Sequence, residues 1–166
     1  MTKTFTPKIY VGTYSKYASG SIEGAWLDLE DYATKDEFHA ACAELHKDET
    51  DPEYMFQDME GIPEGMASEG HVSDDLFDWV NLGAFDRELL YVFRENIDQT
   101  GTLEQAQDVY HGTFDSAAGY AEEITEDCND IPKYLENYID YESMARDMGY
   151  NGTSFVEHNG KIWVFN

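Results

Sequence analysis

The chain has 166 residues, of which 42% are hydrophobic and 14% aromatic. This content is enough to bury a core and argues against disorder. Its 35 acidic residues against 10 Lys and Arg give a net charge of -25 at pH 7. A field of this sign disfavours nucleic acid and anionic membranes as partners and favours basic protein surfaces.

The cysteine content and the absence of long apolar segments predict a cytoplasmic location. Cys42 and Cys128 are the two cysteines, and the sequence opens without an apolar leader. No apolar run approaches the roughly 18 residues of a membrane span. We therefore expect reduced thiols in a soluble cytoplasmic protein.

The N-terminal third predicts strands around one helix. Lys8–Tyr14 alternates apolar and polar residues, and Ile22–Leu29 predicts an antiparallel partner after a turn with Gly and Ser. Thr34, with a glutamate three residues later, is a capping-box pattern that opens a helix, which we expect to cover the sheet. Tyr54–Met59 then predicts a third strand, before several glycines and a proline.

The middle of the chain predicts two helices. Ser73 is a plausible N-cap, and Asp74 and Asp75 suit the positive end of a helix dipole. Apolar surface is supplied by Leu76, Phe77, Trp79, Val80 and Phe85. A second helix is expected over Asp86–Arg94, which carries four apolar residues.

The C-terminal part predicts a strand, two helices and a hairpin. Asn159-Gly160 is a strong signal for a type I′ turn between the last two strands. The expected elements are a strand at Asp108–Phe114, helices at Asp115–Asp127 and Asp140–Met148, and hairpin strands at Thr153–Val156 and Lys161–Val164.

These elements predict an α+β fold made of three small domains. We expect an N-terminal α+β domain over residues 1–61, a small helical domain over 62–103 and a C-terminal α+β domain over 104–166.

Few residues suggest chemistry at a site. His39, Cys42 and His46 have helical spacing that would suit metal ligands, but a buried thiol with two flanking surface histidines is the simpler interpretation. Asp147 begins a stretch that lacks the residue order of a calcium loop. No catalytic motif is present, and we expect no metal, no cofactor and no catalytic residue. A metal-dependent or carboxylate enzyme stays an alternative that tight divalent binding would favour.

The acidic surface itself is the main functional signal. Duplex DNA carries about one charge per 1.7 Å, so 25 charges correspond to roughly 42 Å of duplex. The stretch from Glu122 to Asp130 is acidic with no Lys or Arg, which favours a cationic partner. Adaptation to high salt, or a generic role as acidic partner or chaperone of a basic protein, are the alternatives.

Several segments resemble one protein family over nearly the whole chain. Tyr10-Val-Gly-Thr-Tyr14, Gly20-Ser-Ile-x-Gly24 and Trp26-Leu-Asp-Leu29 resemble the opening of the ArdA antirestriction family. Further resemblance lies in Phe38-His-Ala-Ala-Cys42, Leu45-His-Lys-Asp-Glu49, Asp51-Pro-Glu53, Met55-Phe-Gln-Asp58, Glu60-Gly61, Met66-Ala-Ser-Glu69, Tyr141-Glu-Ser-Met-Ala-Arg-Asp147 and the terminal hairpin.

The resemblance implies an elongated, dimeric mimic of bent B-form DNA, encoded on conjugative plasmids or transposons. Such a protein has no reaction of its own and does not bind nucleic acid. It occupies the DNA-binding groove in the methyltransferase core of type I restriction-modification enzymes. We expect its DNA-mimic surface to include Asp28, Glu30, Asp31, Glu37, Glu44, Asp48, Glu49, Asp51, Asp74, Asp75, Asp78, Glu122, Glu123, Glu126, Asp127 and Asp130.

Overall fold

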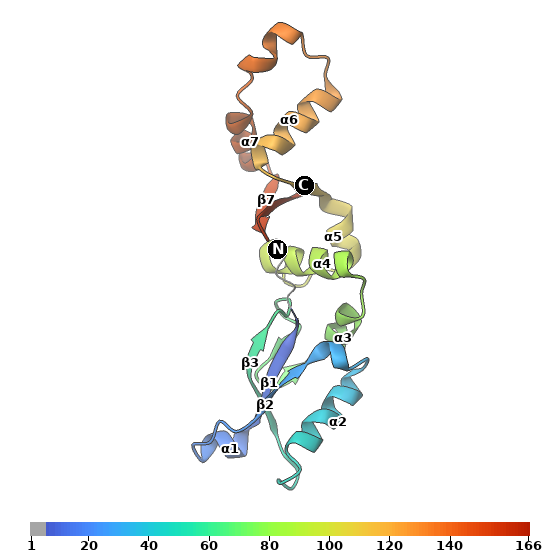
Figure 1. Ribbon diagram of the computed structural model, residues 1–166, viewed down its shortest axis with the longest axis vertical. Coiled ribbons are helices and arrows are strands. Elements are labelled where there is room, and N and C mark those ends of the chain that lie inside the picture. The colour runs from blue at the N-terminus through green and yellow to red at the C-terminus, as the bar shows by residue number, and fades with distance from the viewer. Residues whose placement is uncertain (1–5) are drawn as a thin grey trace. The chain divides into compact units, whose positions relative to one another are not determined.

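The computed structural model describes residues 6–166 (Figure 1). The chain divides into two compact units, Met1–Gly101 and Thr102–Asn166. The mixture of helices and antiparallel strands confirms the α+β class. The division into three domains at residues 61 and 103 stays a prediction.

A three-stranded antiparallel sheet organises the first unit. Its order is β2-β1-β3, so β1 is the central strand. Ile9 and Val11 of β1 are fully buried, as their alternation predicts. All three expected strands are confirmed, with the bounds Lys8–Thr13 for β1, Ala25–Asp28 for β2 and Tyr54–Glu60 for β3.

Two short helices shorten the first pair of strands relative to the prediction. The helix α1, Tyr14–Ala18, begins where β1 was expected to continue, because the side chain of Thr13 caps it by accepting from the Lys16 amide at 3.2 Å. After β2 the chain turns into the 3₁₀ helix η1, Leu29–Asp31.

The helix α2, Lys35–Leu45, covers one side of this sheet, as expected (Figure 1). Thr34 caps it by accepting from the Glu37 amide at 3.2 Å. The Glu37 carboxylate accepts from the Ala33 amide rather than from Thr34, so the capping box is only half formed. The ring of Phe38 is fully buried and lies 5.8 Å from Phe56 of β3, between ring centroids.

The rest of the first unit adds a small hairpin and two helices. The predicted N-cap Ser73 makes no capping hydrogen bond. Among the apolar residues of this region, Phe85 is exposed, whereas Leu76, Phe77, Trp79 and Val80 are buried. The elements are β4 at Ala67–Ser68, β5 at His71–Val72, α3 at Asp74–Val80 and α4 at Ala84–Asn96, the last longer at both ends than predicted.

The second unit begins with a helix that the sequence analysis missed. The helix α5, Leu103–Val109, is closed by a full capping box between Thr102 and Gln105. The strand β6 is therefore confined to Tyr110–Phe114, and the expected start at Asp108 is wrong.

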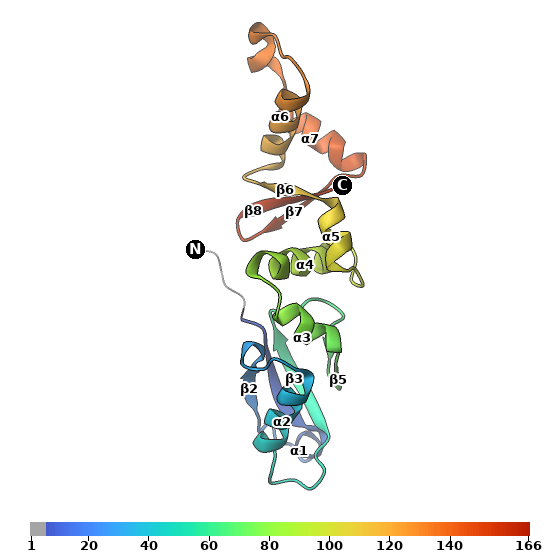
Figure 2. The ribbon, with the colours of Figure 1, turned by 90° about the vertical axis from the view of Figure 1, so that its right-hand side faces the viewer.

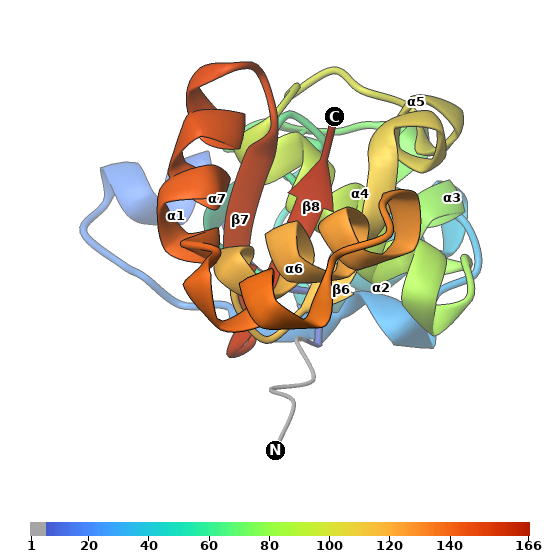
Figure 3. The same ribbon diagram turned by 90° about the horizontal axis from the view of Figure 1, so that it is seen from above.

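Two helices and a sheet complete this unit. Both helices lie on one side of the strands (Figures 2 and 3). The sheet order is β6-β8-β7, and the Tyr120 ring contacts Phe114 of β6 and Phe155 of β7. The bounds are α6 at Ala117–Cys128, α7 at Tyr141–Tyr150, β7 at Ser154–His158 and β8 at Lys161–Phe165. The 3₁₀ helix η2, Lys133–Tyr138, was not predicted.

The predicted hairpin turn is confirmed. Asn159 and Gly160 both have positive φ, 52° and 74°, and the flanking residues His158 and Lys161 pair across the strands. This is the backbone geometry that a type I′ turn requires.

Candidate functional site

The expected acidic surface is exposed in both units. Of the sixteen carboxylates predicted for it, only Asp28 and Glu49 are half-buried, and the other fourteen are exposed. Most lie on helices or at helix ends, so the backbone that carries these charges is ordered. Whether they occupy the positions of DNA phosphates stays a prediction.

Five of these carboxylates in the first unit are paired with the chain's own cations, and two of them, Asp48 and Glu49, share Lys16. Asp48 lies 3.1 Å from the Lys16 ammonium, Glu44 lies 2.6 Å from Lys47, and Asp74 lies 3.6 Å from Lys35. Arg87 pairs with Glu30, which links α4 to η1. Part of the negative charge of this unit is therefore balanced within the fold.

The second unit presents its acidic run without such balance. Within residues 6–166, no ion pair involves Glu122, Glu123, Glu126, Asp127 or Asp130. All five are exposed on α6 or just beyond its end.

The negative charges of the acidic run on α6 affect the pKa of Tyr141. Burial of the hydroxyl raises its pKa, and the charges of Glu126, Glu122 and Glu136 raise it further. The charges of α6 and η2 therefore act together at the start of α7.

Hydrogen bonds fix the charge of several other carboxylates. A hydrogen bond from Lys16 lowers the pKa of Asp48, and one from Lys161 lowers the pKa of Asp115. Hydrogen bonds from Ser143 and Thr100 lower the pKa values of Asp140 and Asp98. These four groups stay ionised over a wider pH range than a free carboxyl.

A cluster around His46 has the composition of a metal site but already contains a cation. Ligand atoms of His46, Asp48 and Glu49 lie within 4.8 Å of one another. The Lys16 ammonium lies among them, 3.1 Å from His46 Nδ1 and 3.8 Å from Glu49 Oε2. The cluster therefore anchors α1 to the turn between α2 and β3.

The histidine in this cluster corrects one prediction. His46 was interpreted as a surface residue, but its side chain is 1% exposed. Its Nε2 lies 3.0 Å from the carbonyl oxygen of Val11, which can only accept, so Nε2 carries the hydrogen and Nδ1 accepts from Lys16. Nothing in the sequence spacing relates Lys16 to a histidine thirty residues later, so this contact could not be predicted.

The two cysteines are free thiols, as expected. Cys42 is buried beside Phe38, and burial raises the pKa of its thiol to about 12. It is therefore a core residue rather than a nucleophile or metal ligand. Cys128 lies exposed at the end of α6.

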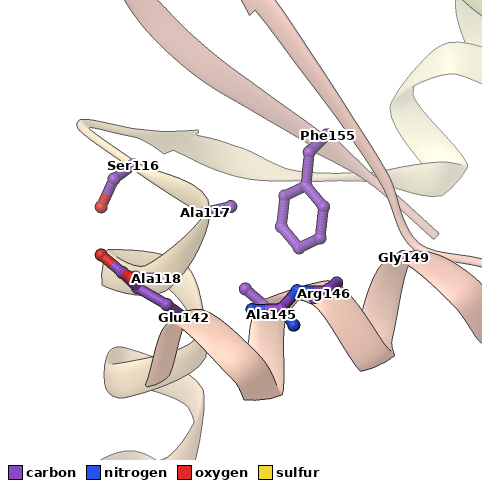
Figure 4. A pocket seen from close by; sticks show the side chains of 8 residues that line it. All are labelled: Ser116, Ala117, Ala118, Glu142, Ala145, Arg146, Gly149 and Phe155. Carbon is purple, nitrogen blue, oxygen red and sulfur yellow. The ribbon is translucent and has the colours of Figure 1, made fainter. Parts of the chain in front are cut away.

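A shallow pocket of about 360 Å³ lies between α6 and α7 (Figure 4). Its lining is mostly small or apolar, and Glu142 and Arg146 are the charged residues at it. None of the carboxylates predicted for the acidic surface lines this pocket. The lining residues are Ser116, Ala117, Ala118, Glu142, Ala145, Arg146, Gly149 and Phe155.

Two glycines in the N-terminal motifs, Gly12 and Gly24, lie close against other parts of the sheet. A Cβ at Gly24 would lie 2.2 Å from the carbonyl oxygen of Val11 in the neighbouring strand. A Cβ at Gly12 would lie 2.3 Å from Nε2 of Gln57. Gly24 and His46 thus both lie against the Val11 carbonyl of β1, so these motif residues are part of the scaffold.

No helix in residues 6–166 combines the length and apolar character needed to cross a bilayer. No curated protein matches the chain. The family model for the antirestriction protein ArdA matches residues 9–162 of the 166. The chain therefore belongs to the ArdA family of antirestriction proteins.

Proposed function

We propose that this protein inhibits type I restriction-modification enzymes by occupying the DNA-binding groove of their methyltransferase core. The observation that carries the proposal is that fourteen of the predicted carboxylates are exposed, eleven of them on the helices η1, α2, α3 and α6, in a chain of net charge -25. Membership of an antirestriction family supports it. The protein acts in the cytoplasm as a binding protein without a reaction of its own, and it does not bind nucleic acid.

The physical basis is competition for cationic side chains. A groove lined with Lys and Arg binds DNA in large part through phosphate charge and the release of counterions. Carboxylates held on helices offer similar charge without a phosphodiester to translocate or cleave. Because their positions are set before binding, little ordering cost is added on association. Both restriction and modification are then blocked, because both need the same groove.

We further propose that the protein is an elongated homodimer of three-domain chains that mimics bent B-form DNA. The support for the dimer is the family resemblance, together with exposed apolar side chains in η2, at Tyr134, Leu135 and Tyr138. Sedimentation equilibrium should give twice the chain mass. Replacing Leu135 and Tyr138 with serine should favour the monomer, and a monomeric wild-type protein would contradict the dimer.

Displacement of DNA tests the inhibition directly. A fluorescent duplex bound to a purified type I methyltransferase should be released by stoichiometric protein, and its anisotropy should fall. Raising the salt from about 0.05 to 0.2 M should weaken the competition, because charge supplies most of the affinity. If the duplex stays bound at micromolar protein, the proposed function is wrong.

The second candidate is a generic acidic partner or chaperone of basic proteins, which the same net charge favours. A histone-like protein that binds as tightly as the methyltransferase would support it.

A further inference from the structure

One face of the first sheet carries aromatic and acidic side chains together. In antiparallel pairs, residues directly opposite each other lie on the same face. Lys8 pairs with Asp28 and Glu60, and Tyr10 pairs with Trp26 and Asp58. We call this set the open face: Lys8, Tyr10, Trp26, Asp28, Asp58 and Glu60.

The helices that cover the sheet lie on the other side. Phe56 of β3 is the partner of the buried Val11, and Phe38 of α2 lies 5.8 Å from the Phe56 ring and 5.7 Å from the Phe77 ring of α3. All six residues of the open face are half-buried or exposed.

Trp26 is the exposed tryptophan of the chain. Its exposed fraction is 39%, whereas Trp79 and Trp163 are 4% and 5% exposed. Tyr10 packs edge-on against it, with ring centroids 5.6 Å apart. This face therefore presents two aromatic side chains, a type of residue that is enriched at protein interfaces.

This face already holds one cation. The Lys8 ammonium lies 4.6 Å from the centre of the Trp26 ring and 3.0 Å from the Glu60 carboxylate. The ring and the carboxylate thus form a site in which a cation is both stacked and paired. The open face has three carboxylates and one lysine, so its formal net charge is -2.

We propose that the open face is a binding surface for an arginine side chain of the partner protein. A guanidinium is planar and stacks on an indole, and its fork of donors can reach Glu60 or Asp28 at the same time. It is also less strongly hydrated than the Lys8 ammonium, so it can displace that group from the ring. A second copy of this chain or a nucleic acid would bring negative charge to a negative face.

The inference rests on the proposed function, because the arginine would come from the DNA-binding groove of the methyltransferase. Binding of arginine to the open face can nevertheless be tested without that enzyme. The probe is a ten-residue arginine peptide, which contains no tryptophan. Acrylamide quenches exposed indoles, so the quenchable emission of this protein comes mainly from Trp26. At about 0.3 M salt, where distant charges are screened, the arginine peptide should protect Trp26, and a lysine peptide should protect it less.

Two lysine variants separate stacking from net charge. Lys8→Met removes the cation that lies over the Trp26 ring. Lys47→Met makes the same change of charge on the turn after α2, away from the sheet. Lys8→Met should tighten arginine-peptide binding about threefold more than Lys47→Met does. Equal effects of the two variants, or no protection of Trp26, would overturn the inference.

The enzyme then tests whether the open face is used. Trp26→Ala should raise the concentration needed to displace DNA from the methyltransferase about three- to fivefold, and Trp26→Phe should raise it less. Tyr17→Ala, at another exposed aromatic of the same unit, should have no effect. If the wild type fails to displace DNA, the proposed function is wrong. Protection of Trp26 by the arginine peptide then tests by itself whether the open face binds arginine. If Trp26→Ala, with an unchanged circular dichroism spectrum, displaces DNA as well as the wild type, the inference alone fails.

Discussion

In the first unit, Glu30, Glu44, Asp48 and Asp74 each pair with a Lys or Arg of the same chain. In the second unit, the acidic run on α6 makes no ion pair within residues 6–166. The composition agrees, because residues 1–101 hold seven Lys and Arg whereas residues 102–166 hold three, at Lys133, Arg146 and Lys161.

The difference separates two uses of acidic residues. In the first unit, part of the charge fixes tertiary structure: Asp48 and Glu49 hold Lys16 and, through it, α1. On α6 the charges repel one another, and no ion pair of the described residues relieves this repulsion. A cationic partner would relieve it on binding, so we expect the second unit to contribute more affinity per charge.

The largest expected effect tests whether the N-terminal motifs are scaffold. Gly24→Ala places a methyl group against backbone that cannot move aside, and it should destabilise the protein by about 2–3 kcal/mol. Gly149→Ala in α7 meets open space and should stabilise by about 0.5–1 kcal/mol. Urea unfolding measures both variants. A Gly24→Ala variant as stable as the wild type would show that the strand contact is not required.

The contacts of Lys16 with Asp48 and Glu49, which hold α1 in the first unit, should depend on pH. The hydrogen bond from Lys16 lowers the pKa of Asp48 in the folded protein below its unfolded value of about 3.9. The ionised Asp48 carboxylate therefore stabilises the fold above about pH 3.9, and this contribution is lost as the pH falls through the folded pKa. Desolvation lowers the pKa of Lys16, but the hydrogen bond and charge of Asp48 outweigh it and raise the pKa overall, so this contribution is lost only at high pH.

Asp48→Asn should therefore lower the melting temperature at pH 7 by about 1–2 °C and by less at pH 2. Asp31→Asn, at an exposed acid with no ion pair in the described part of the chain, should change neither value. Equal losses for the Asp48→Asn variant at both pH values would contradict the electrostatic origin of the anchor.

The smallest expected effect concerns single charges on α6. Glu123→Gln alone should weaken displacement of DNA by less than about twofold, because the surface acts collectively. Titrating each single variant against the methyltransferase checks this. A single carboxylate whose loss abolishes inhibition in a folded protein would contradict a distributed surface.

Local signals made most of the fold predictable. Thr34 before α2 and Asn159-Gly160 before β8 are chemical signals that act within a few residues, and both elements formed as expected. The helix α5 was missed although Thr102 and Gln105 form a capping box, because Leu103–Val109 offers little apolar periodicity. The 3₁₀ helix η2 has no buried residue and hence no pattern to detect.

Some features of the acidic surface could likewise be predicted from the sequence, and others could not. Exposure of the acidic residues follows from composition, and fourteen of sixteen positions are exposed. Which of them are paired depends on contacts between distant segments, such as Arg87 with Glu30 or Lys16 with Asp48. The open face depends on strand register, which places Trp26 beside Tyr10 and Lys8. Such contacts are properties of the folded chain.

The most direct test compares two variants that each lose four charges. One replaces Glu122, Glu123, Glu126 and Asp127 with their amides, and the other does the same at Glu30, Glu44, Asp48 and Asp74. In displacement of duplex DNA from a type I methyltransferase, the first should be weakened at least about tenfold and the second clearly less. Equal weakening would show that only total charge matters, and undiminished displacement by the first variant would contradict the account.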